Sequence, residues 1–216
     1  MEIRTSIPLV ILGDSGVGKT SLRLRFEKFE WQKILEFLEG EKTPLGKILR
    51  IYSSSVVREY SWNSRKYVIE WILTDLVGQE YARAAIENAL VVGRIALLVY
   101  DISRRKTLES LRDWVQSFWK KKEELWKNNA RTRKFVGKKA PVVLIGNKID
   151  LRTSSSACVT TEEGSRFANW LSTELGYKVP FIEISAKDSS MNEIDKVLSL
   201  AFESYMCWLK IVSKTE

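Results

Sequence analysis

The amino-acid sequence predicts an α/β fold, with an open, six-stranded and mostly parallel sheet, one antiparallel edge pair, and helices on both faces. Two observations carry this prediction. Strand-like and helix-like segments alternate along the chain, and residues 94–100 and 141–145 are almost continuously apolar, as strands covered on both faces are. A chain of 216 residues also has the size of one ordinary domain, so we expect residues 1–216 to form a single domain.

Six runs rich in apolar or β-branched residues are the expected strands. In chain order they are residues 7–12, 48–60, 66–73, 94–100, 141–145 and 180–184. Serine and asparagine in Ser61-Trp62-Asn63-Ser64 favour a hairpin turn between the second and third runs. These two runs are therefore the expected antiparallel pair, and the other strands are expected to run parallel.

Apolar residues spaced three or four positions apart predict the helices. The first pattern follows the first strand and uses Leu22, Phe26 and Phe29, and a further helical turn is indicated over residues 34–38. Three later patterns accompany the last three strands: Leu108, Leu111, Val115 and Phe118; Phe167, Trp170 and Leu171; Ile194, Val197, Leu198, Ala201, Phe202 and Tyr205. We expect these apolar stripes to face the core.

A glycine-rich loop joins the first strand to the first helix. It reads Gly13-Asp14-Ser15-Gly16-Val17-Gly18-Lys19-Thr20, with the spacing G-x-x-x-x-G-K-T, and Ser21 continues it into the helix. Its glycines permit a tightly folded backbone whose N–H groups converge on one anion at the helix N-terminus. Lys19 supplies a cation for terminal phosphates, and the Thr20 hydroxyl is a hard oxygen suited to Mg²⁺. The loop therefore predicts a nucleoside triphosphate site.

Three further motifs follow the ends of expected strands. Asp75-Leu76-Val77-Gly78-Gln79 comes after the third strand and fits the pattern D-x-x-G-Q. Asn147-Lys148-Ile149-Asp150 comes after the fifth strand, and Ser185-Ala186-Lys187 after the sixth. The Asp150 carboxylate can accept hydrogen bonds from guanine N1–H and the 2-amino group, two donors that adenine does not offer. The motifs therefore predict a guanine nucleotide.

In this order and strand context, the four elements resemble the Ras superfamily of small GTPases, most closely its Ras and Rab branches. The resemblance covers nearly the whole chain. It implies the small G domain form of the P-loop NTPase fold, with GTP or GDP as ligand and Mg²⁺ as cofactor. It also implies that Asp75 holds Mg²⁺ through a water, that the Gly78 amide senses the γ-phosphate, and that Gln79 orients the attacking water.

The resemblance assigns the base to the last two motifs. Asn147 would tie neighbouring loops together and touch the base edge, the Lys148 stem would cover one face of the ring, and the Ala186 amide would donate to guanine O6. Ser185 and Lys187 flank that amide and are included among the candidate binding residues.

The implied reaction is phosphoryl transfer to water, in the scheme for which Ras proteins are the standard example. Lys19 and Mg²⁺ would neutralise charge and Gln79 would position the nucleophile. No arginine finger can be assigned in the sequence, so we expect a slow intrinsic rate that an activating protein raises. Effector, exchange-factor and GTPase-activating proteins are the implied partners.

The first switch departs from the pattern. Thr43-Pro44-Leu45-Gly46 is close to the Thr-x-Gly or Pro-Thr forms of the family, and Thr43 is the predicted second Mg²⁺ ligand from a hydroxyl. Thr43 lies further before Asp75 than a Rab-like spacing gives. The alternative is therefore that a serine among Ser53, Ser54 and Ser55 takes this role.

Composition bounds the chemistry and the compartment. The chain has no histidine, which excludes imidazole bases and ligands, and its two cysteines suit a reducing cytosol. No apolar run is long enough to span a membrane. Glu2 and the absence of a C-terminal prenylation box predict that no lipid anchor is encoded. We expect a cytoplasmic protein, with peripheral membrane contact as an open alternative.

A basic segment at residues 120–139 is the second departure from the family, and it resembles an insertion. It holds nine Lys and Arg residues against two Glu, within a chain of net charge +8. The open interpretations are a solvated helix extension, contact with an anionic membrane, binding of an acidic protein, and nucleic-acid binding, the last being the least favoured. For the whole chain, the first functional interpretation is a hydrolysing switch in trafficking or signalling. The irregular first switch leaves a non-hydrolysing GTP-dependent scaffold as an alternative, and the basic segment leaves a nucleic-acid-associated GTPase.

Overall fold

The computed structural model describes residues 2–40, 50–77, 90–130, 132, 135, 138–154 and 158–213. The strands in these residues form one six-stranded sheet of order β2-β3-β1-β4-β5-β6. The strands are β1 (Glu2–Leu12), β2 (Arg50–Trp62), β3 (Arg65–Val77), β4 (Ile95–Asp101), β5 (Val142–Asn147) and β6 (Phe181–Ile184). Only β2 runs antiparallel, against β3, among these strands. The predicted fold class is confirmed.

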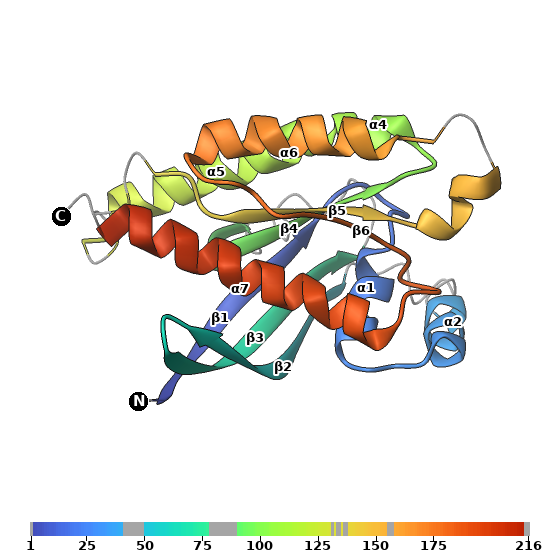
Figure 1. The fold of residues 1–216 in the computed structure, drawn as a ribbon, viewed down its shortest axis with the longest axis horizontal. Coiled ribbons are helices and arrows are strands. Elements are labelled where there is room, and N and C mark those ends of the chain that lie inside the picture. The colour runs from blue at the N-terminus through green and yellow to red at the C-terminus, as the bar shows by residue number, and fades with distance from the viewer. Residues whose placement is uncertain are drawn as a thin grey trace.

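Helices cover both faces of the sheet (Figure 1). They are α1 (Lys19–Phe26), α2 (Trp31–Gly40), α4 (Arg105–Glu109), α5 (Leu111–Asn128), α6 (Thr161–Leu175) and α7 (Met191–Ser213), with a 3-10 helix, η2, at Ile149–Ser154. In Figure 1, α5 and α6 lie along one side of the sheet, and α7 and α1 along the other. No helix in the described part of the chain is long and apolar enough to cross a membrane.

The core follows the apolar runs of the sequence. Every residue of β4 and β5 is buried, because these central strands are covered on both faces. The stripe of α7 packs on the same sheet, with Ile194, Val197 and Ala201 fully buried. These contacts fix the carboxyl ends of the strands, where the predicted motifs lie.

The second strand of the β2–β3 hairpin is longer than its apolar residues predict, because β3 spans Arg65–Val77 whereas the prediction covers residues 66–73. Its register runs from Arg50 opposite Val77 to Trp62 opposite Arg65. Asn63 and Ser64 form the two-residue turn with positive φ values of 48° and 60°, which matches the right-handed twist of the strands. β1 also begins at Glu2, earlier than predicted, because residues 2–6, which are polar apart from Ile3, pair with β3.

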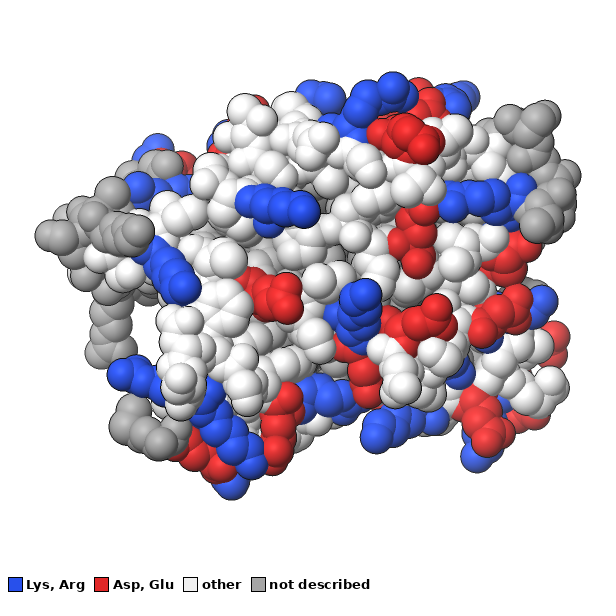
Figure 2. All heavy atoms as spheres, viewed as in Figure 1, with Lys and Arg blue, Asp and Glu red and all other residues white. Residues whose placement is uncertain are grey.

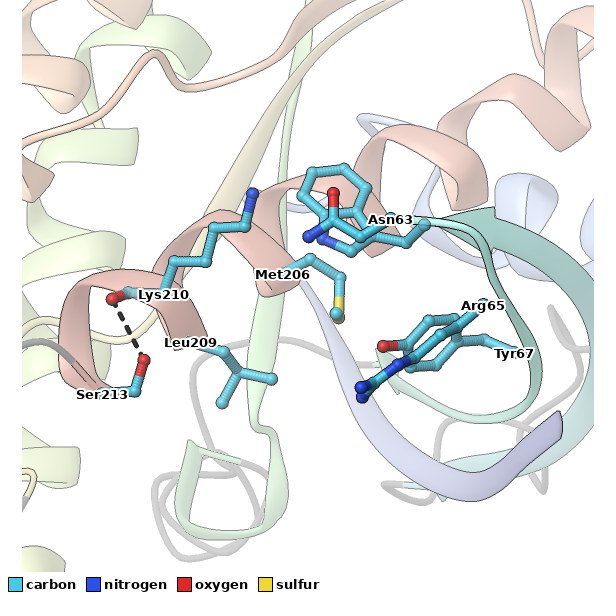
Figure 3. A pocket seen from close by; sticks show the side chains of 8 residues that line it. Asn63, Arg65, Tyr67, Met206, Leu209, Lys210 and Ser213 are labelled. Carbon is cyan, nitrogen blue, oxygen red and sulfur yellow. Dashed lines mark hydrogen bonds between the residues drawn. The ribbon is translucent and has the colours of Figure 1, made fainter. Parts of the chain in front are cut away.

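An aromatic cluster joins this hairpin to α7. The Tyr60 and Phe202 rings stack with their centroids 4.4 Å apart, and Trp71 Nε1 donates to the Tyr60 hydroxyl at 2.8 Å. Beyond the cluster, an open groove of about 440 Å³ lies between the hairpin turn and the end of α7 (Figure 3). Lys210 borders it, with its ammonium 4.8 Å from the centroid of the Trp62 ring.

One helix prediction is wrong at its end. The pattern extends the first helix to Phe29, but α1 ends at Phe26 and Phe29 is 40% exposed. The chain leaves the helix because Lys28 takes a left-handed φ of 66°, with its N–H bonded to Arg25 O. Conversely, the turn indicated over residues 34–38 belongs to a full helix, α2.

Candidate nucleotide-binding site

The glycine-rich loop is shaped by its packing. Gly13 and Gly18 have φ values of 141° and 98°. A Cβ at Gly13 would lie 2.1 Å from Val99 O, and one at Gly18 would lie 2.2 Å from Asn147 Nδ2. Only glycine fits these positions, because both the backbone conformation and the neighbouring atoms exclude a side chain.

The N-terminus of α1 faces this loop without a side-chain cap. Gly18 is its N-cap, and no side chain caps the first turn. The unpaired N–H groups of a helix N-terminus attract an anion. Lys19 lies here with its ammonium donating to Gly13 O and Asp14 O, each at 2.8 Å. Burial lowers the pKa of Lys19, partly opposed by Asp75 and Asp14, and phosphate oxygens are the partner that such a cation favours.

The described residues of the remaining loop hold its shape. Asp14 accepts from Ser110 Oγ at 2.7 Å and from Trp114 Nε1 at 2.9 Å, which ties the loop to α5. Ser15 and Gly16 are exposed, whereas Val17 and Ser21 are buried. The loop is therefore anchored on both sides and open between them.

Two of the predicted Mg²⁺ ligands meet in the structure. Thr20 Oγ1 donates to Asp75 Oδ2 at 2.5 Å, although the two residues come from α1 and from the end of β3. Asp75 is fully buried. A hydroxyl and a carboxylate are hard oxygen donors, so this pair fits Mg²⁺, whose other positions phosphate and water can fill.

The second hydroxyl ligand has two predicted sources, Thr43 and one of three serines, and only the serines lie in the described residues. Ser53, Ser54 and Ser55 pair with β3 inside β2. Ser54 Oγ donates to Glu27 Oε1 at 2.6 Å, which engages it in a structural bond. Thr43 lies outside the described residues, as do Gly78 and Gln79, and their roles stay predictions.

A buried arginine beside Asp75 was not predicted. Arg23 is 4% exposed and its Nε lies 3.9 Å from Asp75 Oδ2. Its guanidinium also forms an ion pair with Glu27, one turn later in α1. Arg23 therefore joins a carboxylate predicted to bind Mg²⁺ to the structural pair of Glu27 and Ser54.

Asn147 connects three loops of the site. It ends β5 and is 1% exposed. Its Nδ2 donates to Val17 O at 2.8 Å, and its Oδ1 accepts from the Ala186 amide at 3.0 Å. The phosphate loop is thereby joined to the Ser185–Lys187 turn. A contact from the Ala186 amide to guanine O6 would be shared with this existing bond.

Asp150 lies beside that turn. Its Oδ1 accepts from Ser185 Oγ at 2.6 Å, and no described residue donates to its Oδ2. The same Ser185 hydroxyl accepts from the Asp188 amide at 2.9 Å. Lys187 is exposed in the turn. A serine thus orients the carboxylate that is predicted to read the base.

Lys148 is held by an acid that was not predicted. It has a left-handed φ of 70°, and its Nζ donates to Asp101 Oδ2 at 2.7 Å. Arg104 bonds the same oxygen at 3.0 Å and also donates to Ser15 O at 3.0 Å. Burial opposes the charge of Asp101, but the bonds from Lys148, Ser103 and Arg104 prevail and lower its pKa. The sequence does contain a signal for this role, because Asp101 is an acidic residue directly at the end of an apolar strand.

Comparisons with known proteins agree with this geometry. A family model described as the Ras family matches residues 8–205. Ras-related protein Rab-11A of Dictyostelium discoideum is 33% identical over 187 residues, covering 86% of this chain and 70% of that protein. Ras-related protein Rab11D of Lotus japonicus is 36% identical over 166 residues, covering 74% of this chain and 60% of that protein.

A longer relative contains a similar region. The Ras and EF-hand domain-containing protein of Danio rerio is 29% identical over 197 residues, which is 90% of this chain but only 24% of that protein. The family model covers most of the chain, and its matched range includes all four nucleotide motifs. The chain therefore belongs to the Ras family of small GTPases.

Proposed function

We propose that this chain is a molecular switch that binds GTP and GDP, hydrolyses GTP with Mg²⁺, and acts in trafficking or signalling. Ras-family GTPases generally bind these nucleotides and hydrolyse GTP. The observation that carries the proposal is the Asn147 side chain, which bonds both the phosphate loop and the Ala186 turn. These two bonds support the proposal because they hold together the motifs that are predicted to bind the phosphates and the base.

The proposed roles belong to residues in different parts of the site. Lys19 and the α1 N-terminus would hold the phosphates, and Asn147, Asp150 and the Ala186 turn would hold the base. Thr20, Asp75 and Thr43 would hold Mg²⁺, which supplies positive charge to the phosphate oxygens when bound. Gln79 would orient the attacking water through its side-chain amide.

Hydrolysis is tested by substituting Gln79→Leu. We expect the single-turnover rate of GTP hydrolysis with Mg²⁺ to fall by about tenfold or more, because the leucine cannot position a water. GTP affinity should change little, since Gln79 is assigned to the nucleophile. The matched control is Gln116→Leu, which removes an exposed glutamine of α5 outside the site.

The alternative is a scaffold that binds GTP without hydrolysing it. The irregular segment around Thr43 is the feature that favours it. Near-zero turnover in both the wild type and Gln79→Leu, with GTP still bound, would replace the switch by this scaffold. Turnover that is unchanged by Gln79→Leu would instead remove Gln79 from its proposed role.

Partner proteins follow from the family, since Ras and Rab GTPases generally act with effectors, exchange factors and activating proteins. We place their contacts at the segments around Thr43 and Gln79. The longer Danio rerio relative is also named for an EF-hand domain, and the proposal for this chain does not include the activity of that additional domain.

The basic segment supports membrane contact less than its composition suggests. Lys121 pairs with Glu124 at 3.5 Å, Lys127 pairs with Glu123 at 3.2 Å, and Lys139 pairs with Glu174. On the face shown in Figure 2, basic and acidic side chains are interspersed. Electrostatic contact of residues 120–139 with an anionic membrane therefore remains a secondary proposal, and nucleic-acid binding a less favoured one.

A further inference from the structure

A second cavity lies away from the nucleotide motifs, between the last turns of α5, the segment before β4 and the C-terminal half of α7. Its volume is about 510 Å³, within the range of small-molecule sites. Its walls are mostly apolar and aromatic, and include Val91, Leu125, Trp126, Phe135, Tyr205 and Trp208. The nucleotide motifs follow the carboxyl ends of the strands, whereas Arg94 in this cavity precedes the amino end of β4.

Lys122 brings a buried ammonium to this cavity. The residue is 3% exposed and lines the cavity. Its Nζ donates to Val91 O at 2.6 Å and lies 5.5 Å from the centroid of the Phe118 ring. An ammonium has three N–H donors, so one hydrogen bond to the described residues leaves this group incompletely satisfied. A buried cation of this kind favours an anionic partner.

The other polar groups of the cavity also favour an anionic ligand. Arg94 lines it as a second cation, and none of the described lining residues is acidic. Trp208 Nε1 is buried and has no hydrogen-bond partner within the described part of the chain. Burial, followed by repulsion from Arg94, lowers the pKa of Lys122 to about 7. An anion beside Lys122 and Arg94 would remove that repulsion and supply an acceptor.

We propose that this cavity binds a small monocarboxylate with an apolar tail, whose carboxylate is held by Lys122 and Arg94 and whose tail packs against Trp126, Phe135 and Trp208. The aromatic walls fit the apolar tail, and the cation that is buried among them fits the head group. The proposal is independent of the nucleotide site, since no described residue of the four motifs lines this cavity.

Octanoate is a suitable probe, measured by isothermal titration calorimetry at pH 6.5 with GDP and Mg²⁺ present. We expect octanoate to bind at least about tenfold more tightly than 1-octanol, which has the same tail without the charge. Acetate, which has the head group without the tail, should show no binding. Equal affinity for octanoate and octanol, or no binding of either, would overturn the proposal.

Two variants assign the binding to the cavity. Lys122→Met keeps a long apolar side chain and should reduce octanoate affinity to that of octanol, whereas Lys120→Met, on the exposed side of α5, should leave it unchanged. Trp208→Phe keeps an aromatic ring but lacks the N–H donor, and should weaken octanoate more than octanol. Unchanged octanoate affinity in Lys122→Met would contradict the assignment even if Trp208→Phe fails to fold.

The pH dependence of octanoate binding tests the charge of Lys122, because a lysine with a purely structural role would not produce it. The charged fraction of Lys122 falls by about tenfold for each pH unit above its pKa of about 7. The other charged or ionisable groups among the described residues that line the cavity are Arg94 and Tyr205. Octanoate affinity should therefore fall by about tenfold between pH 7.5 and pH 8.5, as the ammonium loses its proton. Octanol affinity should stay constant, and a flat octanoate profile would contradict the role of Lys122.

Discussion

Asp150→Asn is expected to weaken GDP binding by about 10³-fold or more and to transfer the preference of the site to xanthosine nucleotides. In the proposed site, the carboxylate would accept from two guanine donors, N1–H and the 2-amino group. An asparagine places its own NH₂ against that amino group and leaves a donor without an acceptor. Xanthine carries an oxygen at the same position, so the amide becomes complementary to it.

The measurement is displacement of a fluorescent guanosine diphosphate by GDP and by XDP. Asp188→Asn is the matched control, because Asp188 is exposed in the turn that contains Ser185. Ser185 Oγ can still donate to the asparagine oxygen, so the fold of the turn should be kept. GDP affinity that survives Asp150→Asn would show that another group reads the base.

The fold could be predicted where continuous apolar residues in the sequence indicate a buried strand. The strands β4 and β5 are continuous apolar runs, and both are buried throughout. Four of the first five residues of β1 are polar, Ile3 being the exception, and the pairing of this segment with β3 makes it a strand. Such tertiary pairing leaves no periodic pattern in the sequence, so the predicted strand begins at residue 7 instead of Glu2.

The candidate site could be predicted from the positions of its residues along the chain. Thr20, Asp75 and Asn147 each lie at a strand end or a helix start, and the topology brings such positions to one edge of the sheet. Arg23 and Lys122 were not predictable, because a single Arg or Lys in an amphipathic helix ordinarily faces solvent. Their burial at 4% and 3% exposure depends on which elements pack against α1 and α5.

Gly13→Ala is expected to abolish nucleotide binding and to lower the free energy of unfolding by more than about 3 kcal/mol. Its φ of 141° is a conformation that a side chain disfavours, and the new Cβ would lie 2.1 Å from the backbone oxygen of Val99. Val99 is buried in β4, so the clash cannot be relieved by rotating a side chain.

Gly176→Ala separates the two causes of this effect. Gly176 also has a positive φ, 73°, at the C-cap of α6, but a Cβ added there would meet no described atom within 4 Å. Conformational strain alone should cost about 1 kcal/mol there and leave GDP binding intact. Urea unfolding gives the stabilities, and the increase in Tm on adding GDP and Mg²⁺ reports binding. If both variants lose the same stability and both still bind GDP, then contact with β4 does not shape the phosphate loop, and its geometry must arise from the loop's own conformation.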